Sequence, residues 1–144
     1  MNITHIDISS LLPHDAPMLL LDTAIEADET TVKTKVTIHE GSLFCQGNAV
    51  GAWVGLEYMA QTIGVHAGFL AKIHNEPIRI GYLLGTRHYS CSVPDFKVGT
   101  TLDILAEREY LMPEEGLGSY HCSILIDGKE IASAVCTVYQ PPKS

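Results

Sequence analysis

Residues 41–71 contain one charged side chain, Glu57, among residues that are otherwise apolar, small or uncharged. The nearest charged residues, Glu40 and Lys72, lie just outside the two ends of this stretch. A carboxylate in an apolar segment is costly to desolvate unless it is paired, hydrogen-bonded or protonated. Glu57 is therefore the first candidate for a functional side chain. The alternative is a carboxylate that points to solvent or caps its own helix.

The same stretch contains the one long helix that the sequence predicts, starting at Gly51 or Ala52 and ending at residue 73. Apolar residues occur on almost every face of this segment, and a helix of this kind is buried. Gly64 and Gly68 are unfavourable inside a helix, by about 1 kcal/mol each relative to alanine. Their spacing of four places them on one stripe, where another backbone can approach closely. We expect that backbone to belong to a sheet wrapped around the helix.

The flanking sequence predicts a short helix, two strands before the long helix and four strands after it. The short helix covers residues 6–12, with Asp7 as its N-cap and Pro13 as its end. The strands are predicted at residues 18–25, 31–38, 79–89, 101–111, 118–127 and 130–139, with a loop at residues 39–50. Asp127-Gly128 predicts a tight hairpin between the last two strands.

This order of elements predicts an α+β fold of one domain, residues 1–144, in which a curled antiparallel sheet surrounds one central helix. That arrangement is the hotdog architecture. Its sheet edges are open, and pairing of two copies would cover them.

The composition excludes several classes of function. The formal net charge of -8 disfavours binding to nucleic acid or to an anionic membrane. The apolar run at residues 49–71 contains Glu57, Gln61, His66 and four glycines, which argues against a membrane span. The N-terminus has no signal-peptide pattern. The four cysteines have neither CxxC nor zinc spacing, so we expect reduced thiols, a cytoplasmic protein and no metal or cofactor.

Three segments resemble the 3-hydroxyacyl-[acyl-carrier-protein] dehydratases in sequence and in order. They read LLPHDAPMLLLD (residues 11–22), LEYMAQTIGVHAG (56–68) and GYLLGTRHYSCSVPDFKVGTTLDI (81–104). The match is closer to a divergent branch, the dehydratase-like proteins of aryl polyene pigment synthesis, on the segments LFCQGNAVGAWVGLEYMAQ (43–61) and GYLLGTRHY (81–89). The resemblance covers nearly the whole chain.

The resemblance implies roles for several residues. In the dehydratases a loop histidine removes the α-proton of the thioester, and a helix glutamate from the partner subunit handles the leaving hydroxyl. A backbone N–H at the helix start polarises the thioester carbonyl. Glu57 matches the glutamate, and the turn around Gly55 matches the carbonyl-binding site. Gln61, one turn further on the same face, would orient the site, or alternatively is a packing amide.

The base departs from the pattern of the family. Asn48 occupies the position of the loop histidine, and asparagine donates hydrogen bonds but cannot accept a proton at neutral pH. His14 lies in the segment that lines the substrate tunnel of the dehydratases, so it is a substitute base, or alternatively a turn-stabilising residue. His66 points to the side of the helix opposite Glu57 and is expected in the core or at an interface.

The function predicted on these grounds is that of a 3-hydroxyacyl-carrier-protein dehydratase, which forms a trans-2-enoyl thioester. The alternatives are an acyl-thioester hydrolase and a non-catalytic partner subunit of a dehydratase. The partners implied are an acyl carrier protein or another acyl thioester, and a second subunit in a homodimer or in a heterodimer with a related dehydratase.

Overall fold

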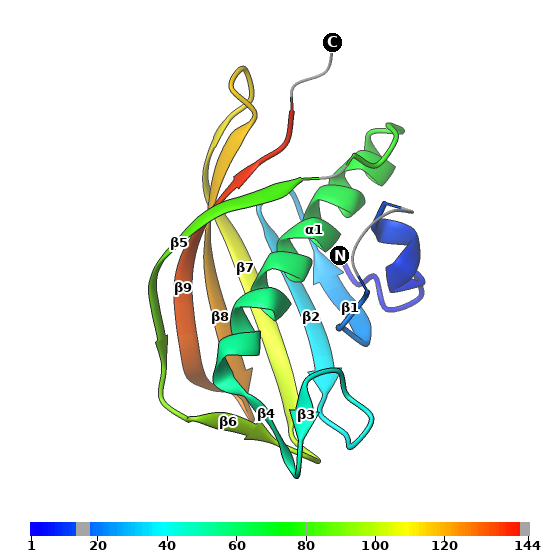
Figure 1. Ribbon diagram of the computed structural model, residues 1–144. Helices are drawn as coiled ribbons and strands as arrows, with labels where there is room; N and C mark the ends of the chain where they lie inside the picture. The colour runs from blue at the N-terminus through cyan, green and yellow to red at the C-terminus, as the bar shows by residue number, and fades with distance from the viewer. Residues whose placement is uncertain (14–17, 80, 142–144) are drawn as a thin grey trace.

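The computed structural model describes residues 1–13, 18–79 and 81–141 (Figure 1). A six-stranded antiparallel sheet in the order β1-β2-β7-β8-β9-β5 curls around the helix α1, which spans Gly55–Ile73. The strands of this sheet are β1 Thr23–Ala27, β2 Thr31–Thr37, β5 Tyr82–Cys91, β7 Thr101–Met112, β8 Leu117–Ile126 and β9 Lys129–Tyr139. The predicted hotdog architecture is confirmed.

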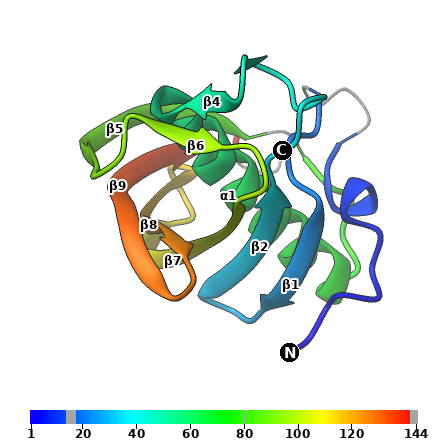
Figure 2. The ribbon, with the colours of Figure 1, turned by 90° about the horizontal axis from the view of Figure 1, so that it is seen from below.

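A smaller sheet in the order β3-β4-β6 lies near the start of α1, as the view from below shows (Figure 2). Its strands are β3 Cys45–Gln46, β4 Ala49–Gly51 and β6 Asp95–Lys97. The sequence predicted a loop at residues 39–50 and no strand at 95–97. These strands are two or three residues long, too short for a period-2 pattern to be visible.

The strand predicted at residues 18–25 begins later, at Thr23. The reason is that the Gln61 side chain occupies backbone groups that would otherwise pair with a neighbouring strand. The Leu20 N–H donates to Gln61 Oε1, and the Met18 carbonyl accepts from Gln61 Nε2. The alternation predicted for residues 31–38 is confirmed. Its inward-facing residues, Val32, Thr34, Val36 and Ile38, are all buried against the helix side of the sheet.

The predicted N-terminal helix is a single 3₁₀ turn, η1, which spans Ile8–Leu11. Asp7 is its N-cap, as predicted, and its carboxylate accepts from the Ser9 N–H at 3.1 Å. This turn packs against α1 at the glycine stripe. A Cβ added to Gly68 would stand 1.7 Å from the Leu11 carbonyl oxygen. The close approach predicted at Gly68 is therefore present, but its partner is η1 and not the sheet.

The helix α1 is buried on its inner face, where Met59, Val65 and His66 are completely inaccessible. The prediction that it is buried on nearly every face is wrong for its outer face, where Glu57 is exposed and Gln61 is half-buried. The sheet curls around only part of the helix and leaves this face open.

The strand β5 forms one edge of the large sheet, with β9 as its neighbour (Figure 1). Its side chains include Tyr82, Leu83 and Leu84, which are 50%, 41% and 58% exposed. This edge therefore presents apolar surface.

No helix within the described residues is long and apolar enough to cross a membrane.

Candidate active site

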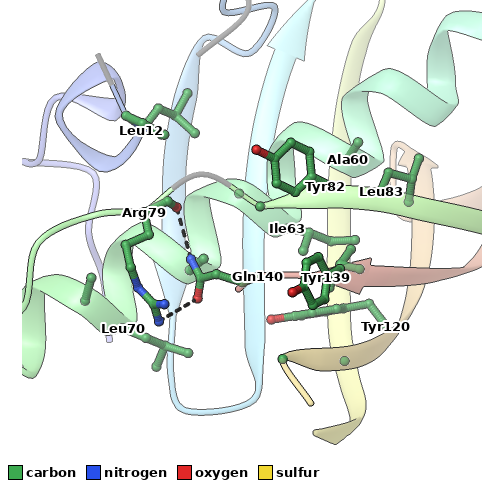
Figure 3. Close-up of a pocket in the computed structure, with 18 of the residues that line it drawn as sticks. Leu12, Ala60, Ile63, Leu70, Arg79, Tyr82, Leu83, Tyr120, Tyr139 and Gln140 are labelled. Carbon is green, nitrogen blue, oxygen red and sulfur yellow. Dashed lines mark hydrogen bonds between the residues drawn. The ribbon is translucent and has the colours of Figure 1, made fainter. Parts of the chain in front are cut away.

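A cavity of about 630 Å³ lies between α1 and the inner face of the sheet (Figure 3). Its apolar wall includes Leu12, Ala60, Ile63, Ala67, Leu70, Leu83, Leu111 and Val138. Polar groups interrupt this wall at Glu57, Gln61, Arg79, Arg108, Tyr120 and Gln140. This cavity is called the groove below. An apolar groove with a few polar groups is typical of a site for a small amphipathic ligand.

Glu57 stands in the first turn of α1 and lines this groove. Its side chain is exposed, and the ion pairs of the described residues do not include it. In the single chain the carboxylate therefore points to solvent at the mouth of the groove. It is available to a ligand or to a group from a second subunit.

Two exposed aromatic residues precede Glu57 in the chain and contact each other. Trp53 comes one turn before Glu57 and is 64% exposed, and Phe44 is 46% exposed. Their ring centroids are 5.2 Å apart in an edge-to-face arrangement. Paired aromatic rings on a surface are a common feature of contact sites.

The start of α1 is fixed by Tyr89 on β5. Its hydroxyl donates to the Ala52 carbonyl, and burial raises the pKa of this phenol. A Cβ on residue 55 would lie 2.5 Å from the same hydroxyl oxygen, so glycine is the residue that fits this position without displacing Tyr89. The Gly55 N–H donates to the Ala52 carbonyl in the 3₁₀ turn η2 (Ala52–Val54). The N–H of Gly55 itself is thus engaged within the turn, and carbonyl binding by the turn around Gly55 stays a prediction.

Gln61 lines the groove and is hydrogen-bonded to the backbone of residues 18–20. Its Oε1 accepts from the Leu20 N–H at 2.8 Å, and its Nε2 donates to the Met18 carbonyl at 3.0 Å. The Gln61 amide thus packs against residues 18–20, and its role in orienting the site stays a prediction. His14, the substitute base, lies outside the described residues.

Asn48 lies in the exposed turn between β3 and β4. Its carbonyl accepts from the Val98 N–H at 2.8 Å, and the described wall of the groove does not include it. Within one chain Asn48 thus does not line the groove that Glu57 lines. A site that needs residues from both positions would have to combine two subunits.

His66 is completely buried, as expected for a core residue. Each of its two ring nitrogens has one hydrogen-bond partner. Its Nε2 lies 2.9 Å from the Asp28 carbonyl and its Nδ1 lies 2.7 Å from the Tyr120 hydroxyl. A carbonyl can only accept, so the proton is on Nε2, and Nδ1 accepts from Tyr120. Burial lowers the pKa of His66, which favours this neutral form.

Tyr120 and Arg108 also line the groove, and no sequence motif pointed to either of them. Burial raises the pKa of Tyr120 to about 12, and the neighbouring Arg108 opposes this shift. A signal for Arg108 was present: it continues the alternating inward series Leu102, Ile104 and Ala106 along β7.

Two further residues, Cys45 and His88, do not line the groove. Cys45 is half-buried, and its Sγ lies 3.8 Å from the Gly47 carbonyl without a basic side chain at hand. His88 is exposed. Within the part of the chain that the structure describes, no three His, Cys, Asp or Glu side chains gather as a metal site would require.

Comparison with known proteins identifies the relatives of this chain. The family model of the ApeP-like proteins, described as ApeP dehydratase, matches residues 6–144. The structure is similar to the dehydratase heterocomplex ApeI:P from Xenorhabdus doucetiae, with a TM-score of 0.85 and 33% identity over 96% of this chain and 93% of that chain. No curated protein sequence matches.

More distant structures share the fold alone. A hypothetical thioesterase with coenzyme A from Streptococcus pneumoniae TIGR4 has a TM-score of 0.65 and 13% identity over 83% of this chain and 85% of that chain. The protein smu.793 from Streptococcus mutans UA159, bound to acetyl CoA, has a TM-score of 0.66 and 16% identity over 91% and 97%. The match over nearly the whole length and the ApeI:P similarity confirm the resemblance seen in the sequence: this chain belongs to the ApeP dehydratase family.

Proposed function

We propose that this chain is one subunit of a 3-hydroxyacyl-carrier-protein dehydratase of polyene synthesis, and that it supplies Glu57 to a site completed by a related dehydratase subunit. The observation that carries the proposal is that Glu57, an exposed carboxylate, lines an apolar groove in which no histidine of the described residues lies near it. The described histidine that lines the groove, His74, follows the other end of α1, about 25 Å away along the axis.

The elimination has a simple proton balance. A base removes the proton from C2 of the thioester, the C2–C3 double bond forms, and the C3–oxygen bond breaks. The Glu57 carboxyl donates a proton to the leaving hydroxyl, which departs as water. The base then returns its proton to Glu57 directly or through solvent.

The source of the base is a second subunit in this proposal. Asn48 cannot accept a proton, and it does not line the groove that Glu57 lines. The related ApeI:P is a dehydratase heterocomplex, which supports a partner of a different sequence. His14 is the competing candidate, because the adjacent Pro13 lines the groove. We place the reaction in the cytoplasm, with an acyl carrier protein as the substrate carrier.

The test is to incubate the chain, alone and co-purified with the related dehydratase, with 3-hydroxyacyl-carrier protein and to follow the products by mass spectrometry. Loss of water in the complex alone supports the proposal. Activity of the isolated chain that His14→Ala abolishes would assign the base to His14. Release of free acid would establish hydrolysis, the alternative function on this fold.

A matched pair of variants tests the role of Glu57 in the complex. Glu57→Gln should lower kcat at least about 100-fold, the usual contribution of a positioned acid. Glu40→Gln, also exposed and outside the groove wall, should leave kcat unchanged. Full activity of Glu57→Gln would show that this subunit supplies no catalytic residue.

A further inference from the structure

Arg79 and Gln140 join two segments that lie outside the strands, one before β5 and one after β9. The Arg79 guanidinium donates to Gln140 Oε1 at 3.4 Å, and Gln140 Nε2 donates back to the Arg79 carbonyl at 3.0 Å (Figure 3). The same guanidinium also donates to the Pro141 carbonyl. Arg79 and Gln140 thus bond each other in both directions, and this pair is called the latch below.

A further contact holds the latch against the sheet. The Gln140 N–H donates to the Gly116 carbonyl at 2.8 Å. Gly116 has a φ of 73°, and a Cβ on residue 116 would stand 2.2 Å from the Gln140 carbonyl oxygen. Glycine is therefore required here both by the left-handed backbone and by the close approach. These contacts fix Gln140 beside the turn that precedes β8.

The latch lies at the C-terminal end of α1. The Glu76 N–H donates to the Ala71 carbonyl at 2.8 Å, and Arg79 follows three residues later in the chain. Figure 3 shows Arg79 and Gln140 at the end of the groove where Leu70 lies. Both latch residues are half-buried and line the groove.

One face of α1 sets the distance between the latch and Glu57. Glu57, Gly64 and Ala71 all line the groove. Successive members of this series are seven residues apart, which is close to two helical turns, so the three share one face of the helix. From Glu57 to Ala71, 14 positions later in α1, the helix advances about 21 Å. The groove therefore runs from the carboxylate to the latch along most of the helix.

The two ends of this path differ chemically from its middle. Between them the wall is apolar at Ala60, Ile63, Ala67 and Val138. Burial of an acyl chain against such a wall raises its affinity about threefold to fourfold for each methylene. The latch presents a guanidinium and an amide instead, so a chain that passes it must displace their hydrogen bonds and leave polar groups unpaired. The gain per methylene should therefore stop at the latch.

We infer that Arg79 and Gln140 are specificity-determining residues, and that their latch limits the length of the acyl chain that the groove accepts. An extended chain advances roughly 1.2 Å per bond. With the third carbon of the thioester at Glu57, about 17 bonds would reach the latch. The inference rests on the proposed function in taking Glu57 as the thioester end of the groove.

The test measures equilibrium binding of unreactive ligands to the full chain. The probes are 2-oxoalkyl thioethers of coenzyme A, which neither eliminate water nor undergo hydrolysis. Their alkyl chains range from half the predicted length to one and a half times that length, at concentrations below those at which micelles form. The affinity should rise about threefold to fourfold per methylene until the chain reaches the latch, and it should not rise beyond that length.

Variants show whether the latch causes this break in the profile. Gln140→Ala should move the break to chains about three bonds longer, which is the reach of the side chain that is lost. Gln140→Glu keeps an acceptor for Arg79 and should keep the break near its wild-type position. Gln46→Ala is the matched control, because this exposed amide at the end of β3 does not line the groove. Its profile should equal that of the wild type.

Two results would overturn the inference. One is an affinity that rises without a break over the whole range in the wild-type chain, and the other is a break that stays in place in Gln140→Ala. If Gln140→Ala does not fold, Arg79→Met tests the same movement. Because no probe reacts, a missing dehydratase activity would refute the proposed function without changing the position of the break.

Discussion

Gly68 of α1 and Leu11 of η1 are in direct backbone contact, since a Cβ on residue 68 would stand 1.7 Å from the Leu11 carbonyl oxygen. Gly68→Ala should therefore destabilise the fold by about 1–3 kcal/mol, or roughly 3–10 °C in Tm. Gly64→Ala is the matched control, because its Cβ would meet only the Leu12 side chain, at 3.3 Å. Thermal unfolding by circular dichroism measures both. Equal Tm values for the two variants would contradict this packing.

Gln61 should be important for the order of residues 18–20, to which its side chain is hydrogen-bonded. Gln61→Leu would leave the Leu20 N–H and the Met18 carbonyl without their present partner, at a cost of about 1–3 kcal/mol in the free energy of unfolding. Hydrogen exchange at Leu20 should accelerate in the same variant. Gln46→Leu, an exposed amide at the end of β3, should change neither quantity. A purely catalytic role for Gln61 would leave exchange at Leu20 unaltered.

The burial of neutral His66 predicts a loss of stability in mild acid. Its pKa is lower in the folded chain than the ordinary value of 6.5, so the unfolded chain binds more protons between these two values. The free energy of unfolding should be unaffected by His66 above about pH 6.5 and should decrease as the pH falls below it. Urea unfolding between pH 5 and 8 measures this dependence.

The control for that experiment is His66→Gln, whose amide can donate to the Asp28 carbonyl and accept from Tyr120 without titrating. The variant should be less stable at neutral pH but should lose less stability on acidification. An identical pH dependence in the two proteins would show that other groups cause the acid sensitivity.

The contact between Gly55 and Tyr89 predicts non-additive effects. Tyr89→Phe removes the hydrogen bond to the Ala52 carbonyl and should cost about 0.5–1.5 kcal/mol. Gly55→Ala should cost more, because its Cβ would lie 2.5 Å from the Tyr89 oxygen. The double variant should be more stable than the sum of the two effects predicts, since removing the hydroxyl relieves the clash. Strict additivity in denaturant unfolding would contradict this geometry.

The elements that the sequence predicted well are those set by local patterns. The strand at residues 31–38 alternates apolar and polar side chains, and its buried face followed directly from that pattern. Asp7 was identifiable as a cap because N-caps act within three residues. Glu57 was identifiable because its neighbours carry no charge.

The features that the sequence did not predict depend on contacts between distant residues. The late start of β1 results from a bond between Leu20 and Gln61, 41 positions apart. A glycine stripe on a helix indicates that another backbone packs closely against it, but it does not indicate which one. The sequence therefore could not show that the partner of Gly68 is the 3₁₀ turn and not the sheet. The identity of the base in the proposed reaction also stays a prediction. Within one chain, Asn48 does not line the groove that Glu57 lines.

The exposed apolar edge at β5 has a consequence for the supply of this protein in the cell. Tyr82, Leu83 and Leu84 lie on a strand with a free pairing side, and such edges associate with other strands unless they are covered. Chains made in excess of the partner subunit would keep this edge strand uncovered, and they would be prone to aggregation and proteolysis. We therefore expect its steady-state level to follow the amount of the partner dehydratase, with the free subunit short-lived.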